Sequence, residues 1–444
     1  MKQLAKILGI SGLILCLGGL GIFAVGYAYG GSDYIGTTDY ENFKKALHLA
    51  EEATQEQTPE SKVSSDNMKS AKKNTADTKT YKMKNKKLGA FSSIAADLDY
   101  IDLIIKPSKN QSAYLSYELH CKNNKNPFTY KIKDGCLHLN ESNFIEAWAA
   151  VNNSSKLNTS INQWKFTVQS YINTVTLYVP SGTTYKNSNI VMNEGDLAVN
   201  GLRCKKANLK LEDGDAAVKK LSCGNITVTT TDGDLIISDL NVTGTATVKT
   251  ADGDITLTGV KVPGTLQLDT EDGDINARLK VSGTLKIDTE DGDITVPSLS
   301  VSGTARINVL DGDINAPNPG ISGSLQINTE DGDLNISNLH TYASGTVKIN
   351  TEYGDINASQ LNISGNTQFR STGGDMLLQI SRQCLNRLAI SADVTDGNIS
   401  VNKTLHGSKK RRGDGWYYTK KATGSKASLK VHTGDGDISI RSGQ

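Results

Sequence analysis

A short turn built on Gly-Asp returns at nearly constant intervals through the C-terminal half of this 444-residue chain. Most copies read Asp-Gly-Asp, and successive central glycines lie 19 to 23 residues apart before one last interval of 39. The central glycines are Gly195, Gly214, Gly233, Gly253, Gly273, Gly292, Gly312, Gly332, Gly354, Gly374, Gly397 and Gly436. A period near twenty residues, held this closely, is typical of a solenoid in which each turn of the chain is one structural repeat.

Apolar and polar residues alternate on both sides of each turn. Around Gly292 the apolar or threonine positions are Leu285, Ile287, Thr289, Ile294 and Val296. A period of two indicates β-strands with one buried face. Twenty residues are too few for a strand, a crossover helix and a second strand, which need about thirty. The sequence therefore predicts an all-β fold, a single-stranded parallel β-helix (β-solenoid) with coils of about 20 residues.

Stacked coils are expected to place equivalent side chains in ladders. Two inward ladders are predicted, Leu266, Leu285, Ala305, Leu325 and Val347, and Leu268, Ile287, Ile307, Ile327, Ile349 and Phe369. Two outward columns are predicted, Gln267, Lys286, Arg306, Gln326, Lys348 and Gln368, and Asp269, Asp288, Asn308, Asn328 and Asn350. Amide and guanidinium groups at regular spacing suit sugar hydroxyls or wall polymers. The alternative is a solvated surface whose side-chain ladders contribute a few tenths of a kcal/mol each.

The turn aspartates are also expected to form columns, in which like charges about 5 Å apart repel by ~1 kcal/mol in water. A ladder of bound Ca²⁺ ions is one predicted way to offset this repulsion, since Ca²⁺ is coordinated by carboxylate and carbonyl oxygens. Its candidate ligands are Asp232, Asp234, Asp252, Asp254, Asp272, Asp274, Asp291, Asp293, Asp311, Asp313, Asp331 and Asp333. In the alternative, each Asp bonds its own neighbouring N–H groups, Gly supplies φ > 0, and water and lysines screen the charge. No other cofactor is predicted.

The N-terminal segment carries a second strong signal. Residues 7–29 contain no charged residue, and lysines precede them while acidic residues follow. This length and charge bias predict an uncleaved, single-pass transmembrane anchor with a cytoplasmic N-terminus, and cleavage as a signal peptide stays open. The predicted order is a cytoplasmic tail (1–6), the anchor (7–29), an extracytoplasmic linker (30–80), a β-rich capping region (81–187) and the solenoid repeats (188–440).

Cysteine spacing predicts one cross-link within the repeats. Cys204 and Cys223 each precede the first Asp of their turn by nine residues, so they are expected to stack on adjacent coils. Outside the membrane an oxidising milieu permits a disulfide at that separation. Two reduced thiols in the core are the alternative.

A basic run interrupts the repeat near the C-terminus. Residues 409–412 read Lys-Lys-Arg-Arg, and residues 416–418 read Trp-Tyr-Tyr. A basic run beside aromatic residues is a plausible contact for an anionic polymer or a partner. The alternative is a loop that folds over the last coil and caps it.

Three further features carry a family resemblance. They are the extended segment from Asp99 to Lys106, the Leu-Tyr-Val-Pro-Ser-Gly run at residues 177–182, and the Gly-Asp-Ile turns. Over residues 82–440 the chain resembles the bacterial "putative adhesin" β-strand-repeat domain of unknown function (DUF4097 type), which includes LiaG-like envelope proteins. The resemblance implies a β-helical fold, an envelope location and an N-terminal anchor.

Together these features predict a membrane-anchored, adhesin-like binding or scaffolding surface at the bacterial cell envelope. The expected partner is a cell-wall or surface polymer; in the alternative function, an accessory to envelope-stress sensing, it is another membrane protein. The formal net charge of +1 gives no reason to expect nucleic acid. We predict no enzymatic activity, because the acids are spread evenly and no Gly-x-Ser-x-Gly, phosphate loop or Cys-x-x-Cys occurs. A polysaccharide-acting β-helix enzyme is the remaining alternative.

Overall fold

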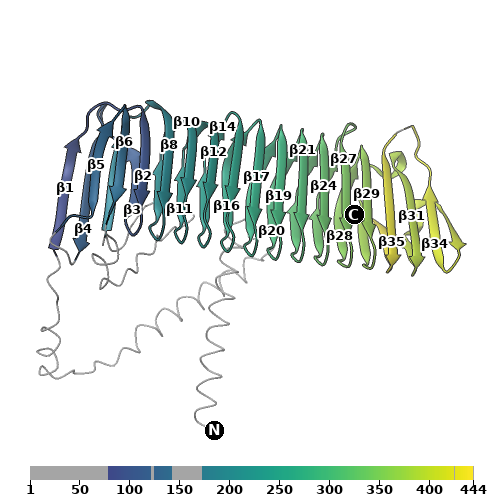
Figure 1. The fold of residues 1–444 in the computed structure, drawn as a ribbon. Coiled ribbons are helices and arrows are strands. Elements are labelled where there is room, and N and C mark those ends of the chain that lie inside the picture. Colours follow the sequence, from purple (N-terminus) through teal and green to yellow (C-terminus); the bar gives the residue numbers. More distant parts are fainter. Residues whose placement is uncertain (1–78, 122–124, 143–172, 425, 444) are drawn as a thin grey trace, which may run out of the picture. The chain divides into compact units, whose positions relative to one another are not determined.

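The computed structural model describes residues 79–121, 125–142, 173–424 and 426–443, all of which lie in one compact unit. The predicted tail (1–6), anchor (7–29) and nearly all of the linker (30–80) lie outside the described residues. Within the ranges that the structure describes, no helix is both long enough and apolar enough to cross a membrane. Thirty-six strands in these ranges join in one sheet that winds into a solenoid (Figure 1).

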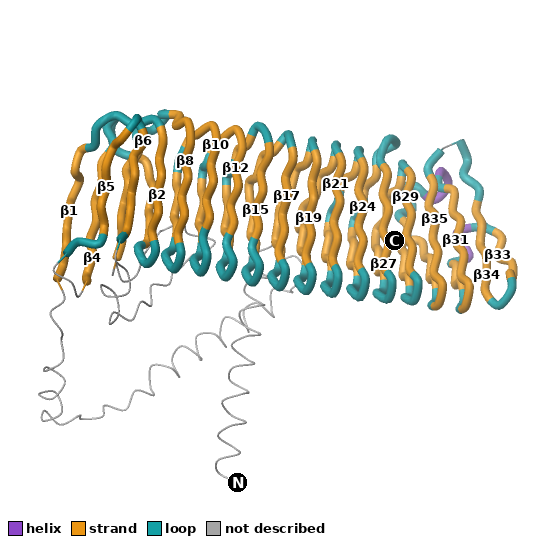
Figure 2. The backbone as a smooth tube through the Cα atoms, viewed as in Figure 1, coloured by secondary structure: helices purple, strands orange, loops and turns teal. Residues whose placement is uncertain are grey.

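Each coil has two main strands, joined at one end by the glycine-centred turn (Figure 2), and three of the described coils add a separate short third strand. The first face contains β2 (Ser93–Leu98), β6 (Cys136–Glu141), β8 (Thr184–Met192), β10 (Arg203–Lys210), β12 (Ser222–Thr229), β15 (Thr245–Lys249), β17 (Thr265–Thr270), β19 (Thr284–Thr289), β21 (Thr304–Val309), β24 (Ser324–Thr329), β27 (Thr346–Thr351), β29 (Asn366–Ser371), β35 (Ser428–Asp435) and β31 (Ala389–Asp396).

The second face contains β3 (Asp102–Pro107), β9 (Leu197–Asn200), β11 (Ala216–Lys219), β13 (Leu235–Ser238), β16 (Ile255–Val262), β18 (Ile275–Val281), β20 (Ile294–Val301), β22 (Ile314–Pro317), β25 (Leu334–Ser337), β28 (Ile356–Ile363), β30 (Met376–Ile380), β36 (Ile438–Ser442) and β32 (Ile399–Val401). The short third side is formed by β14 (Asn241–Val242), β23 (Gly320–Ile321), β26 (His340–Thr341) and the ends of longer strands such as β28. The coils pair in parallel, which confirms the predicted all-β parallel solenoid with coils of roughly twenty residues.

The interior consists of the predicted apolar ladders. Leu285 pairs in register with Leu266 on one side and Ala305 on the other, and Ile287 pairs with Leu268 and Ile307 in the same strands. All members of both predicted ladders are at most 3% exposed. Burial of each aliphatic side chain of this kind contributes roughly 1.5–3 kcal/mol to the free energy of folding. The two outward columns are likewise in register from β17 to β29.

The turn glycines are required by close approach between coils. A Cβ atom built at Gly292 would lie within 3.0 Å of the carbonyl oxygen of Gly273, and the same overlap recurs along the column. From Gly195 to Gly374 none of these turn glycines has a positive φ; only Gly397 and Gly436 do. The expectation that Gly supplies φ > 0 in these turns is therefore wrong, and the physical cause is the stacking of one turn's backbone directly on the next.

Residues with a left-handed backbone conformation (positive φ) lie instead at the bend between the second face and the short third side. Seven coils carry a residue there with φ between 51° and 73°, namely Gly201, Lys220, Asp239, Gly259, Asn318, Asn338 and Gln360. Glycine, asparagine and aspartate tolerate this conformation best among the natural residues. This column has no fixed sequence signature, so the repeat alone did not predict it.

Antiparallel strands close the N-terminal end. On the second face, β4 (Tyr114–Cys121) pairs antiparallel with β7 (Asn173–Val179), and β1 (Lys79–Lys87) pairs antiparallel with β4. On the first face, β5 (Phe128–Lys133) pairs antiparallel with β6. Strand β1 carries five lysines at the edge of the sheet. Charged edge strands discourage pairing with another chain, so this end is protected against end-to-end polymerisation.

At the C-terminal end the coils do not follow one another in sequence order. The last coil in the sequence, β35 with β36, pairs on one side with β29 and β30 and on the other with β31 and β32. The coil made of residues 389–401 is therefore the terminal one in space. The 39-residue interval between Gly397 and Gly436 reflects this exchanged order. The chain leaves the solenoid after the coil at residues 389–401 and returns to form β35 and β36 between that coil and β29–β30.

The basic run belongs to a hairpin that covers this terminal coil. Strands β33 (Ser408–Arg412) and β34 (Gly415–Lys420) pair antiparallel, and β34 pairs antiparallel with β31. Tyr418 is 3% exposed, and its hydroxyl donates to the Leu405 carbonyl over 3.3 Å. Lys409 lies over the Trp416 ring, 4.0 Å from its centroid. This arrangement is that of a cap, with a basic outer edge strand. Two short 3-10 helices, η3 (Leu385–Arg387) and η4 (Lys403–Leu405), complete this end.

Candidate functional site

The second aspartate of each turn forms a hydrogen-bonded column, which we call the second acidic column. Its members are Asp196, Asp215, Asp234, Asp254, Asp274, Asp293, Asp313, Asp333, Asp355, Asp375 and Asp437. In each step Oδ1 accepts from the backbone N–H of the aspartate in the next coil, as Asp293 does from Asp313 over 2.8 Å. The expected bond of each Asp to its own neighbouring N–H groups is therefore replaced by a bond between coils.

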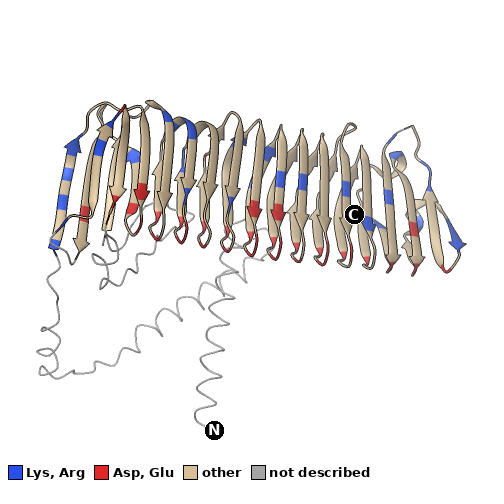
Figure 3. Cartoon of the chain, viewed as in Figure 1, with Lys and Arg blue, Asp and Glu red and all other residues tan. Residues whose placement is uncertain are grey.

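The first aspartate of each turn is exposed along one edge of the solenoid, and we call this set the first acidic column (Figure 3). Its members are Asp213, Asp232, Asp252, Asp272, Asp291, Asp311 and Asp331. The neighbouring Asp232, through a hydrogen bond and charge repulsion, raises the pKa of Asp252. Among the residues that the structure describes, no three His, Cys, Asp or Glu side chains could together hold a metal ion.

The Ca²⁺ ladder stays a prediction with a direct test. If Ca²⁺ binds along these turns, CaCl₂ should raise the midpoint of thermal unfolding, because a ligand that binds only the folded state stabilises that state by mass action. The effect should exceed that of MgCl₂ at equal ionic strength, since Ca²⁺ accepts more oxygen ligands in flexible geometry. Equal shifts in the two salts would contradict the ladder and leave only screening of the first acidic column.

The hydrogen-bonded column begins at a buried aspartate. Asp102 is 7% exposed, and its Oδ1 accepts from the backbone N–H of Asp196 over 3.1 Å. Burial, with the nearby charge of Asp196, raises the pKa of Asp102 from 3.8 to about 7. A carboxyl with a raised folded-state pKa contributes stability that is complete below its unfolded pKa and is lost as pH rises through the folded pKa.

We therefore expect Asp102→Asn to flatten part of the pH dependence of stability. The asparagine keeps the acceptor oxygen but cannot ionise. Between about pH 4 and pH 7 the natural chain should lose up to about 4 kcal/mol relative to the variant. Thermal unfolding of both chains across this pH range measures the difference in their stability. The contributions of the other carboxyls cancel in that difference because both chains contain them. Two pH profiles that stay parallel would contradict a buried, protonated Asp102.

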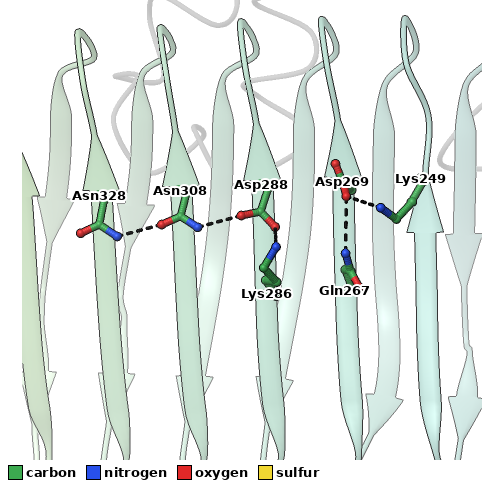
Figure 4. Close-up of polar contacts among 7 residues, drawn as sticks. All are labelled: Lys249, Gln267, Asp269, Lys286, Asp288, Asn308 and Asn328. Carbon is green, nitrogen blue, oxygen red and sulfur yellow. Dashed lines mark hydrogen bonds and ion pairs between the residues drawn. The ribbon is translucent and has the colours of Figure 1, made fainter.

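From β19 to β27 the outward column is a continuous chain of side-chain hydrogen bonds, and Figure 4 shows its first three members, Asp288, Asn308 and Asn328. Asn308 Nδ2 donates to Asp288 Oδ1 over 2.7 Å, and Asn328 Nδ2 donates to Asn308 Oδ1 over 2.8 Å. Asn350 extends the chain by donating to Asn328 over 2.9 Å. Each of these bonds fixes a half-buried amide, so the face presents ordered donors and acceptors at the spacing of the coils, about 4.8 Å.

Lysines accompany the two acidic members of this column. Lys286 Nζ lies 2.5 Å from Asp288 Oδ2, and Lys249 bonds Asp269 in the neighbouring coil (Figure 4). These side chains are 24–47% exposed, so each pair contributes at most about 1 kcal/mol. The predicted polar face therefore exists as a regular and nearly charge-balanced surface.

The two candidate cysteines are direct neighbours. Cys204 pairs in register with Cys223 on adjacent coils of the short third side, and both are buried. Both are free thiols in this structure, and the hydrogen bond between them, together with burial, raises the pKa of the Cys223 thiol. The disulfide stays a prediction. Mass spectrometry of the non-reduced protein should find the two peptides linked; recovery of both thiols free would contradict it and leave the reduced core pair.

A polar groove of about 520 Å³ lies at the C-terminal end of the short third side. Its walls include Asn338, His340, Gln360, Asn362, Gln379 and Gln383. It exists because the third side ends at β28. The following coil leaves at Ser381, whose N–H donates to the Leu361 carbonyl over 2.9 Å, and the inserted coil ends at Gly443. The regular repeat pattern carries no signal for this groove.

One sequence signal could have pointed to the groove. The interval from Gly332 to Gly354 is 22 residues, where neighbouring intervals are 20. The two extra residues fall in the corner after β26 and include Tyr342, whose ring is 52% exposed and lies 4.6 Å from the ring of His340, centroid to centroid. An insertion that carries an exposed aromatic residue indicates a local function better than the regular repeat does.

The fold and its repeated faces define the class of the chain as a capped β-solenoid. A family model described as Toastrack DUF4097 matches residues 91–300, 242–343 and 337–441. Together these matches cover well over half of the chain, which therefore belongs to the Toastrack DUF4097 family. This confirms the resemblance noted in the sequence. The comparison with curated proteins finds no match.

Several solved structures are similar to the chain. One is described as a putative cell adhesion protein from Clostridium sporogenes (12% identity, 83% of this chain and 100% of that chain covered, TM-score 0.15). Two are from Parabacteroides distasonis, one described as a putative adhesin and one as a putative lipid binding protein. Each shows 13% identity, coverage of 69% of this chain and 94% of that chain, and a TM-score of 0.26.

Proposed function

We propose that this protein is a membrane-anchored, extracytoplasmic solenoid whose regular faces serve as an adhesin-like binding or scaffolding surface at the bacterial cell envelope. The observation that carries the proposal is the ordered polar face from β19 to β27, in which hydrogen-bonded amides recur at the spacing of the coils. A repeated array of donors and acceptors suits a repetitive ligand such as a wall or surface polymer, because each coil can repeat the same contact. The anchor rests on the apolar segment at residues 7–29.

The carboxylates of the solenoid have structural roles that favour a binding surface over catalysis. The second acidic column uses its Oδ1 atoms for bonds between coils, and the first acidic column is spread evenly along an exposed edge. A hydrolase or lyase needs a few carboxylates converging on one substrate bond. We therefore propose that the chain is not an enzyme.

Capture from intact envelopes tests this proposal. The full chain, carrying a C-terminal affinity tag, is cross-linked in cells, isolated from the membrane fraction, and analysed for bound polymer and bound protein. We expect recovery in the membrane fraction with co-purifying envelope polymer. A chain that stays in the soluble fraction would contradict the anchor, and capture of a membrane protein without polymer would favour the envelope-stress alternative.

A further inference from the structure

The groove at the end of the short third side differs chemically from the rest of the surface. Its walls are formed by amide, imidazole and hydroxyl groups, and no charged side chain lines it. An amide both donates and accepts hydrogen bonds, as a sugar hydroxyl does. A carboxylate or phosphate ligand would find no cation in these walls to offset its charge. The lining therefore suits an uncharged ligand rich in hydroxyl groups.

Hydrogen bonds between coils hold part of the groove in place before any ligand arrives. Asn362 Nδ2 lies 3.1 Å from His340 Nδ1, and these residues are paired in register on β28 and β26. Asn338 Nδ2 donates to Asn318 Oδ1 over 2.9 Å in the preceding coil. Side chains fixed in this way lose little conformational freedom when a ligand binds, which favours affinity.

The exposed tyrosine beside the groove adds an apolar face. Tyr342 packs edge to face against His340, yet half of its surface remains exposed. A pyranose ring is apolar on its faces and hydroxylated around its edge, so an aromatic ring next to amides matches both parts. Binding pockets commonly combine such an apolar surface with a few convergent polar groups.

The dimensions indicate a short oligosaccharide. The walls come from three successive rows, which contain Asn338, Gln360 and Gln379, and successive rows are one coil apart. At about 4.8 Å per coil, three rows span roughly 10 Å, the length of about two sugar rings. We propose that this groove is a binding subsite for a neutral oligosaccharide. This inference rests on the proposed function and deepens it by naming the ligand class.

The test uses the full chain in detergent and two uncharged probes, maltotriose and triacetylchitotriose, with trigalacturonate as the charged probe. Binding is followed by saturation-transfer NMR and isothermal titration. We expect at least one neutral trisaccharide to bind with a dissociation constant in the millimolar range or below. The double substitution Gln379→Ala/Gln383→Ala should weaken the affinity for that trisaccharide about tenfold or more, because two hydrogen bonds of about 1 kcal/mol each are lost. The matched control, Asn335→Ala/Asn357→Ala, removes two exposed amides outside the groove and should bind normally.

Tyrosine variants provide a second measurement. Tyr342→Ala should weaken the neutral probe, whereas Tyr353→Ala, which removes an even more exposed ring, should not. The inference is overturned if neither neutral probe binds, if the groove variants bind as well as the natural chain, or if trigalacturonate binds equally. If the natural chain captures envelope polymer but Gln379→Ala/Gln383→Ala binds the neutral trisaccharide as well as the natural chain does, the groove assignment fails while the proposed function stands. If the natural chain captures no polymer, the proposed function itself fails.

Discussion

The substitution Gly292→Ala is expected to lower the midpoint of thermal unfolding by several degrees, whereas Gly320→Ala should leave it unchanged or raise it slightly. The Cβ added at Gly292 would overlap the Gly273 carbonyl oxygen, which belongs to the backbone and cannot rotate away. The coils would have to separate locally, at a cost of about 3 kcal/mol or more. A Cβ at Gly320 meets no atom within 4 Å, and its φ is not positive.

Circular dichroism melts of the two variants, recorded together, check this prediction. Alanine at an unstrained glycine position typically stabilises by about 0.4–1 kcal/mol through the unfolded state, so the two substitutions should differ in sign. Because solenoid coils interact mainly with their neighbours, new protease cleavage in the Gly292→Ala chain should concentrate near that coil. Midpoints that agree between the two variants would show that the coils do not stack as closely as described.

Removal of residues 428–444 is expected to unfold two coils instead of one. The deleted segment contains β35 and β36, which are the parallel partners of both β29–β30 and β31–β32. Without them the coil at residues 389–401 has no parallel neighbour and should unfold with its hairpin cap. The protease-resistant core should therefore end near residue 380.

Limited proteolysis with intact-mass analysis measures where the core ends. A chain that stops at residue 382 is the matched control, because it also lacks the terminal coil and should give the same resistant core. If the chain that stops at residue 427 remained protected through residue 401, the coils would follow sequence order, and the exchanged order would be wrong.

The apolar ladders could be predicted because their information is local and repeated. Leu285 and Leu325 hold the same place in their coils, and a period of two specifies which face is buried. The outward columns followed from the same register. The reason for the turn glycines could not be read in this way, because the overlap at Gly292 depends on how closely two backbones stack.

The order of the last coils and the polar groove depend on longer-range choices. The coil at residues 389–401 and the final coil both carry the inward alternation, so either could have docked on Phe369. The structure places Val431 next to Phe369, and the hairpin occupies the outer edge of β31. The groove arises from that same exchange, because both coils near it lack the third strand. Periodicity carries no information about which of two equivalent docking partners is used.

The exchanged order at the C-terminal end bears on how a chain synthesised from its N-terminus can mature. From β8 to β30 the coils can add one after another as they emerge, each on the last. The coil at residues 389–401 cannot do so, because its neighbour is made of residues 428–442, which are synthesised later. Closure of this end therefore has to await synthesis of residues 428–442, so a chain terminated before residue 428 retains an unpaired sheet edge that can associate with other chains.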